Sequence, residues 1–436
     1  MPNIKVLQGV VNKKNIDKSL KSIDWIIHGQ GVFVFKSEIE SSFKILNQEK
    51  TDGFKISLTK EEWKVKRISN EDGFISQKEK SGFINKSGAY YWISFDSQNQ
   101  LIQCGIGEPR VDTRGYYYQF DKTDSNKLLM ESLISIEWNE EIQPYYLLKN
   151  PITTNVPLLV KDMNQLSMDD VASNRYLPTS FLPTIGEKLY RCIAGDKFHL
   201  DTKDFPDFSK AIEYSIRTPG LWCNTRLKEK ATEFGKDPQP LETYLRITLG
   251  QNNGESPGIP YVMEIWPVGH YSPIHNHSGA NAIIRVLYGD INVKLYPFLC
   301  DDKDTIEPFA EKDFTTGDIT WISSNLNQVH QLKNKETNQK TCITIQCYMY
   351  DEEDKKHYDY FDYLGDQNSK RQYEPDSDMD FIEFKKKMQE EWSQRPKNMN
   401  PKTLFAFLQK QQNQQQNQQQ NQNKNQKNNK KKNMKK

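Results

Sequence analysis

Three histidines are the residues of this chain whose types and spacing are best suited to chemistry. His275 and His277 stand one residue apart in the segment 269–277. On an extended strand, residues at this spacing point to the same face, so both imidazoles can reach one metal ion. His330 follows in a later β-rich stretch of a chain with seven histidines, and it is a candidate third ligand. Three neutral nitrogen ligands with open positions beside them are typical of a catalytic metal site.

A His-x-His pair can also be two polar side chains on the solvated face of a sheet. The neighbouring sequence favours the metal site, because its apolar residues predict a compact β unit around the pair. Strands are expected at 244–249, 261–266, 282–287, 291–296, 318–322, 329–332 and 342–350, with a tight turn at Gly289 and Asp290.

The 436 residues are too many for one ordinary core, and the composition changes along the chain. Short apolar and aromatic runs at 31–35, 54–58, 89–95 and 101–107 predict a β-sandwich or jelly roll in the first third. Apolar residues at helical spacing predict helices at 185–193, 211–216 and 381–392. The fold class predicted is therefore mainly β, with a few helices before the second β domain.

The expected division of the chain follows these patterns. We expect a β-sandwich domain at 1–150, a linker at 151–179, a second β domain at 180–365, a helical extension at 366–408 and a tail at 409–436. The tail is almost only Gln, Asn and Lys. Such residues bury no apolar surface that could offset the entropy of ordering, so we expect the tail to be disordered.

The composition argues against several classes of protein. The 59 Lys and Arg residues nearly balance 58 Asp and Glu, which disfavours a nucleic-acid-binding protein. No apolar stretch has the length of a membrane span, and the first residues lack the apolar core of a signal peptide. We expect a soluble cytoplasmic protein without a membrane partner. The six cysteines lack Cys-x-x-Cys spacing and are expected to be reduced.

The histidine segments resemble the cupin motifs. Gly269, followed by His275 and His277, is similar to the first motif, and the stretch from Gly317 to His330 and Asn334 is similar to the second. Cupins usually carry a Glu four or five residues after the second histidine of the first motif. Those positions here are Asn281 and Ala282.

A three-histidine cupin without that carboxylate resembles the thiol dioxygenases, and cysteine dioxygenase in particular. The segments 194–196 and 244–246, the latter Tyr244-Leu245-Arg246, resemble further parts of that family. The resemblance covers about residues 184 to 363. It implies a cupin fold, an Fe(II) cofactor held by His275, His277 and His330, and oxidation of L-cysteine by O2 to cysteine sulfinic acid.

The resemblance also assigns roles to three further residues. Arg246 matches the arginine that binds the substrate carboxylate, for which its planar guanidinium is suited. Tyr244, which precedes it on the same strand in the family's Tyr-x-Arg pattern, is expected to be a second substrate-binding residue. A structural salt bridge is the alternative role for Arg246. Tyr348 matches the active-site tyrosine, and a purely structural tyrosine is its alternative.

Two features of the family are missing. Its Ser-His-Tyr relay is replaced by Thr344, Gln346 and Tyr348, so the middle imidazole is absent. The cysteine that forms a thioether crosslink to the tyrosine in the animal enzymes falls on Ala282, so this crosslink cannot form.

Other functions stay open at the level of sequence. Related dioxygenases act on 3-mercaptopropionate or cysteamine and lack the arginine, so Arg246 favours an amino-acid thiol. Three histidines also suit a zinc hydrolase. The chain could instead be an inactive cupin that binds a metal or ligand. Residues 90–110 resemble the β-sandwich module named after farnesoic acid O-methyltransferase, and the ligand of this domain is unknown. The partners expected from the resemblance to the thiol dioxygenases are a small thiol and O2.

Overall fold

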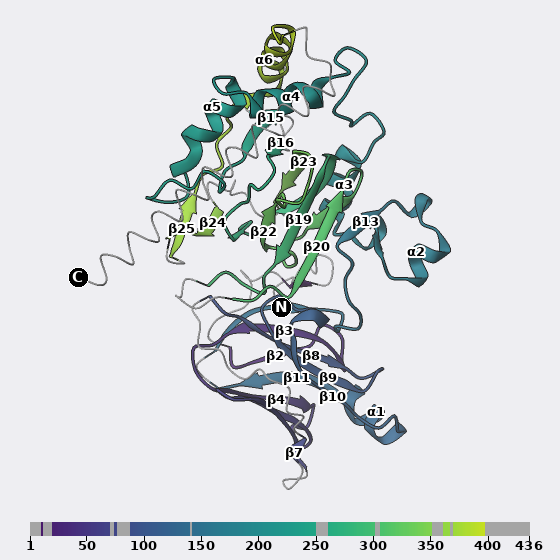
Figure 1. The fold of residues 1–436 in the computed structure, drawn as a ribbon. Helices are drawn as coiled ribbons and strands as arrows, with labels where there is room; N and C mark the ends of the chain where they lie inside the picture. Colours follow the sequence, from purple (N-terminus) through teal and green to yellow (C-terminus); the bar gives the residue numbers. More distant parts are fainter. Residues whose placement is uncertain are drawn as a thin grey trace, which may run out of the picture.

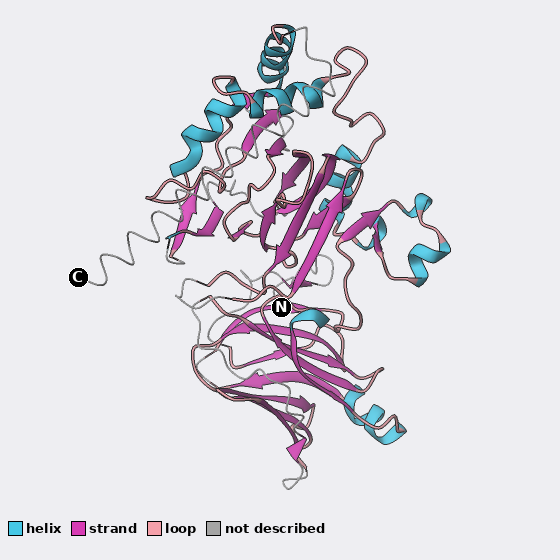
Figure 2. Cartoon of the chain, in the orientation of Figure 1, coloured by secondary structure: helices cyan, strands magenta, loops and turns pink. Residues whose placement is uncertain are grey.

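The computed structural model describes residues 10–11, 20–69, 74–75, 88–139, 142–249, 260–300, 306–350, 361–366 and 369–396. The tail expected at 409–436 lies outside these residues. Within them the protein is mainly β, as predicted, with several antiparallel sheets and a few helices (Figure 2). None of the described helices is long and apolar enough to cross a membrane.

The first part of the chain forms a β-sandwich of two sheets. One sheet has the order β1 (Val10–Val11), β12 (Gln143–Leu148), β3 (Gln30–Lys36), β8 (Tyr91–Asp96), β9 (Leu101–Ile106) and β10 (Arg114–Gln119). The other has the order β2 (Ser22–Asp24), β11 (Leu133–Trp138), β4 (Ser41–Asn47), β5 (Gly53–Leu58), β6 (Trp63–Arg67) and β7 (Phe74–Ile75). The turn η2 (Val111–Thr113) and the helix α1 (Asp124–Glu131) lie in the connections.

Alternation along the strands builds the core of this sandwich. Phe33 and Phe35 of β3 point between the sheets and pack against Phe43 of β4, with ring centroids 6.1 and 4.4 Å from that of Phe43. Val32 and Val34 point to the opposite face and pack with Ile152, which follows the last strand of the sandwich. Since β3 is buried on both faces, the sandwich is covered on one side by later residues of the chain.

The second β region also consists of two sheets (Figure 1). The larger has the order β14 (Tyr176–Pro178), β13 (Leu159–Lys161), β21 (Ile319–Ile322), β18 (Asn281–Tyr288), β23 (Cys342–Met349), β16 (Tyr261–Trp266), β15 (Leu245–Leu249) and β26 (Met379–Asp380). The smaller has the order β20 (Ala310–Thr315), β19 (Asp290–Leu295), β22 (Val329–Lys333), β17 (His275–Asn276), β24 (Phe361–Leu364) and β25 (Lys370–Tyr373).

The segment 151–179 differs from the linker that the sequence predicts. Its strands β13 and β14 extend the larger sheet, and Leu159 of β13 pairs with Thr320 of β21. The segment also holds η3 (Met163–Gln165) and α2 (Met168–Ala172). Each of these strands has three residues, too few to show the alternation by which a strand is recognised in a sequence.

Helices cover the outer face of the larger sheet. They are η4 (Thr179–Phe181), α3 (Thr184–Ile193), α4 (Phe208–Arg217), α5 (Trp222–Glu229), η5 (Lys230–Thr232) and α6 (Phe381–Ser393). Of these, α3, α4 and α6 lie at the positions predicted for them, whereas α5 and the short 3-10 helices were not predicted. The buried face of α3, with Leu189 and Ile193, packs against β18 and β23. Asp380 caps α6 by accepting a hydrogen bond from the Ile382 amide, and Phe384 packs against the sheet and α4. The opposite face of the sheet is left to form the interior of the barrel.

Candidate metal centre

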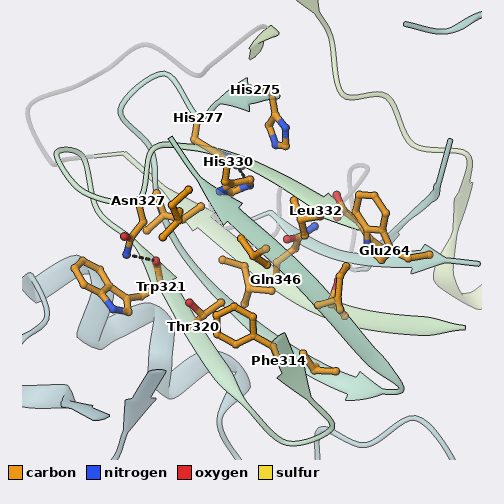
Figure 3. Close-up of a pocket in the computed structure, with 18 of the residues that line it drawn as sticks. Glu264, His275, His277, Phe314, Thr320, Trp321, Asn327, His330, Leu332 and Gln346 are labelled. Atoms are coloured by element: carbon orange, nitrogen blue, oxygen red, sulfur yellow. Dashed lines mark hydrogen bonds between the residues drawn. The ribbon is translucent and has the colours of Figure 1, made fainter. Parts of the chain in front are cut away.

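Antiparallel pairing of two short strands brings the three histidines together. His275 of β17 lies directly opposite His330 of β22, and His277 follows β17. The ligand atoms of the three side chains lie within 4.8 Å of one another. Figure 3 shows the three imidazoles gathered at one end of the barrel interior. Among the described residues the group contains no carboxylate.

Two of the ring nitrogens face each other. The Nε2 atoms of His277 and His330 are 3.1 Å apart, and Nδ1 of His277 has no hydrogen-bond partner among the described residues. Bonds from a metal ion to histidine nitrogen are about 2.1 Å long, so two nitrogens at this separation can bind one ion. The ligand atoms lie at most 4.8 Å apart, and two metal–nitrogen bonds in line span about 4.2 Å, so small side-chain shifts bring all three within reach of one ion. The residues present therefore fit a metal ion.

Burial keeps these imidazoles ready to bind a metal. Desolvation lowers the pKa of His275 to about 4, and the positive charge of Arg246 adds to this effect. Burial also lowers the pKa of His277 and of His330 well below the ordinary value, and each is further lowered by a neighbouring histidine. The neutral imidazole is the form that binds a metal ion, so the three side chains are in the ligating state at neutral pH.

Backbone hydrogen bonds orient two of the rings. Nδ1 of His275 lies 3.0 Å from the carbonyl oxygen of Pro273, and the ring of His330 hydrogen-bonds to the backbone of Asn327. If Nδ1 of His275 carries the proton, its Nε2 is free to bind an ion. Partners of this kind fix the tautomer and the direction of a metal-ligating histidine.

The histidines open onto a cavity inside the barrel with a volume of about 50 Å³. Both sheets contribute to its walls, and all the site residues predicted from the sequence line it: Tyr244, Arg246, His275, His277, His330 and Tyr348. Apolar side chains from the smaller sheet, including Val293, Leu295 and Leu332, form much of the remaining wall. The structure thus brings together residues that are up to 104 positions apart, from Tyr244 to Tyr348.

A buried ion pair lies in the polar wall of this cavity. Arg246 of β15 faces Glu264 of β16, and Nη1 of Arg246 donates to Oε1 of Glu264 at 2.9 Å. The two side chains are only 5 and 7% exposed, so little water screens the pair. Burial raises the pKa of Glu264, while Arg246 and Gln346 oppose the rise. The assignment of Arg246 to a substrate carboxylate stays a prediction, and Glu264 is already one of its acceptors.

The two tyrosines occupy different parts of the wall. Tyr244 stacks on Trp266, with ring centroids 4.2 Å apart, and belongs to an aromatic cluster. The Tyr348 ring stacks against His277 at 5.8 Å, and Tyr348 lies directly opposite Ala282. Ala282 thus adjoins Tyr348, and alanine has no sulfur with which a crosslink could form.

Thr344 and Gln346 share the inner face of β23 with Tyr348, and all three line the cavity. Figure 3 shows Gln346 on the barrel wall beyond the histidines. An amide cannot accept and release a proton near neutral pH as an imidazole does. These positions therefore offer hydrogen bonds to a ligand but no imidazole relay.

Glu264, Asn327 and Phe361 are among the cavity residues that were not identified from the sequence. Glu264 is an acidic residue at an inward-facing position of a strand. Its sequence position points to the cavity only when Arg246 is known to lie opposite it. Asn327 lies in the loop before His330, and Phe361 contacts His277 with ring centroids 4.8 Å apart. The sequence gives no pattern that marks Asn327 or Phe361.

No family model matches the chain. Solved structures with similarity include the cupin domain of Schizosaccharomyces pombe Cnp3, at 12% identity over 25% of this chain and 65% of that one, with a TM-score of 0.20. The DMSP lyase DddQ from Ruegeria pomeroyi DSS-3 matches at 16% identity over 26% of this chain and 49% of its own, with a TM-score of 0.19. Oxalate oxidase matches at 15% identity over 24% of this chain and 51% of its own, with a TM-score of 0.20.

This chain spans less than two thirds of the length of each of these three proteins. Similarities of this extent do not identify a substrate or a reaction. The strand pairing and the histidine group describe a cupin-like region with a site that can hold a metal ion, within a mainly β chain.

Proposed function

We propose that the protein is a non-haem iron thiol dioxygenase that oxidises L-cysteine with O2 to cysteine sulfinic acid. The observation that carries the proposal is the group of His275, His277 and His330, without a carboxylate among the described ligands, at a small internal cavity. Three neutral ligands leave both positive charges of a divalent ion uncompensated, which favours an anionic donor such as a thiolate.

The three histidines would hold Fe(II), which when bound supplies a centre that stabilises the thiolate and activates dioxygen. Sulfur is oxidised by four electrons, O2 is reduced by four, and both oxygen atoms join the sulfur. The reaction therefore needs no further electron donor. In this proposal Arg246 binds the substrate carboxylate, Tyr244 supports that wall, and the Tyr348 hydroxyl hydrogen-bonds at the reacting end of the substrate.

The size of the cavity supports a small substrate. A volume of about 50 Å³ holds only a few water-sized groups, since one water needs about 10 to 15 Å³ by the same measure. A thiol with a short carbon chain suits such a space. The six free cysteines also favour the cytoplasm, where thiols stay reduced, as the location of the protein.

Glu264 favours a second candidate, a dioxygenase for cysteamine. Its carboxylate compensates the charge of Arg246 and could accept a hydrogen bond from a substrate ammonium group. L-cysteine carries both a carboxylate and an ammonium group, 3-mercaptopropionate carries only the first, and cysteamine only the second. The three thiols therefore distinguish the contributions of Arg246 and Glu264.

Oxygen consumption by the iron-loaded protein with these three thiols tests the proposal. We expect consumption with L-cysteine and one sulfinate formed per O2, identified by mass spectrometry. Metal-free and zinc-loaded protein are the controls, because a zinc hydrolase would be active with zinc and would consume no oxygen. Absence of oxygen uptake with every thiol, in protein shown to contain iron, would contradict the proposed function.

A further inference from the structure

The loop that leads into His330 is held by the N-terminal sandwich. This loop, residues 323–328, connects β21 to β22 and ends two residues before the histidine. Asn327 has a φ of 61°, in the left-handed region that Asn tolerates better than most residues. Its backbone accepts the hydrogen bond of the His330 ring, and its side chain donates to the Trp321 carbonyl at 3.0 Å (Figure 3). The position of Asn327 therefore affects the direction of the His330 ring.

Glu108 of the sandwich binds the backbone of this loop. It follows β9, and its side chain is 0% exposed. Its two carboxylate oxygens accept hydrogen bonds from the amides of Asn327 and Gln328, at 2.8 and 2.7 Å. A carboxylate with both oxygens occupied by adjacent amides fixes the height and the orientation of that peptide segment.

Arg110 adds a second contact from the same domain. Its Nη1 donates to the side-chain oxygen of Asn327 at 2.9 Å, and its Nη2 donates to the carbonyl of Val156 at 3.1 Å. Nη1 also lies 3.9 Å from a Glu108 oxygen, so the two buried charges compensate each other. The backbone and the side chain of Asn327 are thus both held by the sandwich.

The same loop connects to the other side of the metal site. The Gln328 side chain accepts from the amide of Gly279 at 2.9 Å and donates to the carbonyl of Ala280 at 2.9 Å. The Ala280 amide in turn donates to the carbonyl of His277 at 2.9 Å. Contacts that begin at Glu108 therefore continue, through Gln328, to the turn that follows His277.

We propose that Glu108 and Arg110 are positioning residues for the metal centre, so that the N-terminal sandwich is a working part of the metal site. They act through Asn327 and Gln328, which orient His330 and the turn after His277. Residues that orient metal ligands from outside the site support metal binding, and loss of one such residue commonly weakens metal binding by about 10- to 100-fold. Glu108 and Arg110 of the sandwich would act in this way. This inference concerns metal binding, so it can hold whether or not a thiol is the substrate.

The full-length variant Glu108→Gln tests the inference. It keeps the size of the side chain but replaces one carboxylate oxygen with an NH2 group. This NH2 group faces the backbone N–H of Asn327 or Gln328, so one of the two hydrogen bonds is lost. We expect the affinity for Co(II), measured by competition with a chelator, to fall about tenfold or more. The absorption bands of bound Co(II), which report its ligand geometry, should also change. Faster hydrogen exchange at residues 323–330 in the metal-free protein should accompany both effects.

Asp52→Asn is the matched control. Asp52 pairs with Arg67 within the sandwich, at 2.9 Å, so this variant also removes a carboxylate that is bonded to a cation. It should bind Co(II) as the parent does. If Glu108→Gln fails to fold, Arg110→Lys, which cannot reproduce the two-donor geometry of the guanidinium, serves in its place. Parent-like Co(II) affinity and spectrum in a folded Glu108→Gln or Arg110→Lys protein would overturn the inference.

Failure of the proposed function has a different signature. A parent protein that binds Co(II) tightly but oxidises no thiol would refute the dioxygenase and leave the positioning role intact. Unchanged Co(II) binding in the variants, together with thiol oxidation by the parent, would refute only the positioning role.

Discussion

Arg246 and Glu264 lie directly opposite each other on β15 and β16, and they form a buried ion pair in the wall of the cavity that the three histidines share. The pair has two consequences. It contributes a compensated pair of charges to the interior of the barrel. It also offers a small substrate both a donor for a carboxylate and an acceptor for an ammonium group.

The first prediction concerns stability. Arg246→Ala leaves Glu264 buried without its cation and should lower the free energy of unfolding by about 3 to 5 kcal/mol. The double variant Arg246→Met, Glu264→Leu removes both charges and should be less destabilised than Arg246→Ala alone. Urea unfolding of the metal-free proteins measures both values. A double variant whose loss of stability relative to the parent equals the sum of the losses in the two single variants would show that the pair is not coupled.

The second prediction concerns the choice of thiol. If Arg246 binds the substrate carboxylate, its truncation should cost about 2 to 5 kcal/mol in kcat/KM for L-cysteine and leave cysteamine little affected. Glu264→Gln should instead weaken turnover of cysteamine and improve that of 3-mercaptopropionate, because it removes the charge that competes for Arg246. Steady-state oxygen uptake with all three thiols measures these changes. Equal losses for all three thiols in Arg246→Ala would indicate that Arg246 supports the barrel and does not contact the substrate.

The parts of the site that follow a local pattern could be predicted from the sequence, and the parts that depend on distant pairing could not. His275 and His277 were identified because a spacing of two residues on a strand fixes their common direction. Glu264 was not identified, since an acidic residue in a strand more often faces water, and only the register of β15 and β16 shows that it faces Arg246.

Glu108 shows the same limit over a longer distance. It is 219 residues before Asn327, and nothing in the local sequence of either segment indicates that they meet. The helices α3 and α6 were predicted because each buries residues spaced by three or four positions along its own sequence. The strands β13 and β14 were missed, since three residues are too few for a recognisable period.

The third prediction concerns the pH dependence of the metal-free fold. Burial lowers the pKa of His277 and His330 in the folded state, so the unfolded chain takes up protons first as the pH falls below about 6.5. The unfolded state then binds more protons than the native state, and stability must fall as the pH decreases from there toward the lowered pKa values. The melting temperature of the metal-free protein should therefore decline over this range.

Replacing both His277 and His330 with Gln should make this decline shallower. His270 and His275, whose pKa values burial lowers to about 4, contribute in the same direction and remain in that variant, so part of the decline should persist. His199→Gln, at an exposed position outside the site, is the control. Parallel profiles for the parent and the His277, His330 variant would contradict the role of these two residues.

The last prediction concerns the metal itself. Three ligands that converge on one point define one site, so the protein reconstituted with Fe(II) should hold about one iron per chain. The double variant His275→Ala, His277→Ala leaves a single ligand and should lose both iron and turnover. His330→Ala leaves two ligands and should bind iron more weakly. Since each change removes a side chain that lines a cavity, the variants should keep the circular dichroism spectrum of the parent, and iron analysis after gel filtration gives the metal content.

His199→Ala removes a histidine outside the site and should retain the parent's iron. Full iron content and full thiol oxidation in the double variant would mean that the metal is held elsewhere, and the proposed centre would then be wrong.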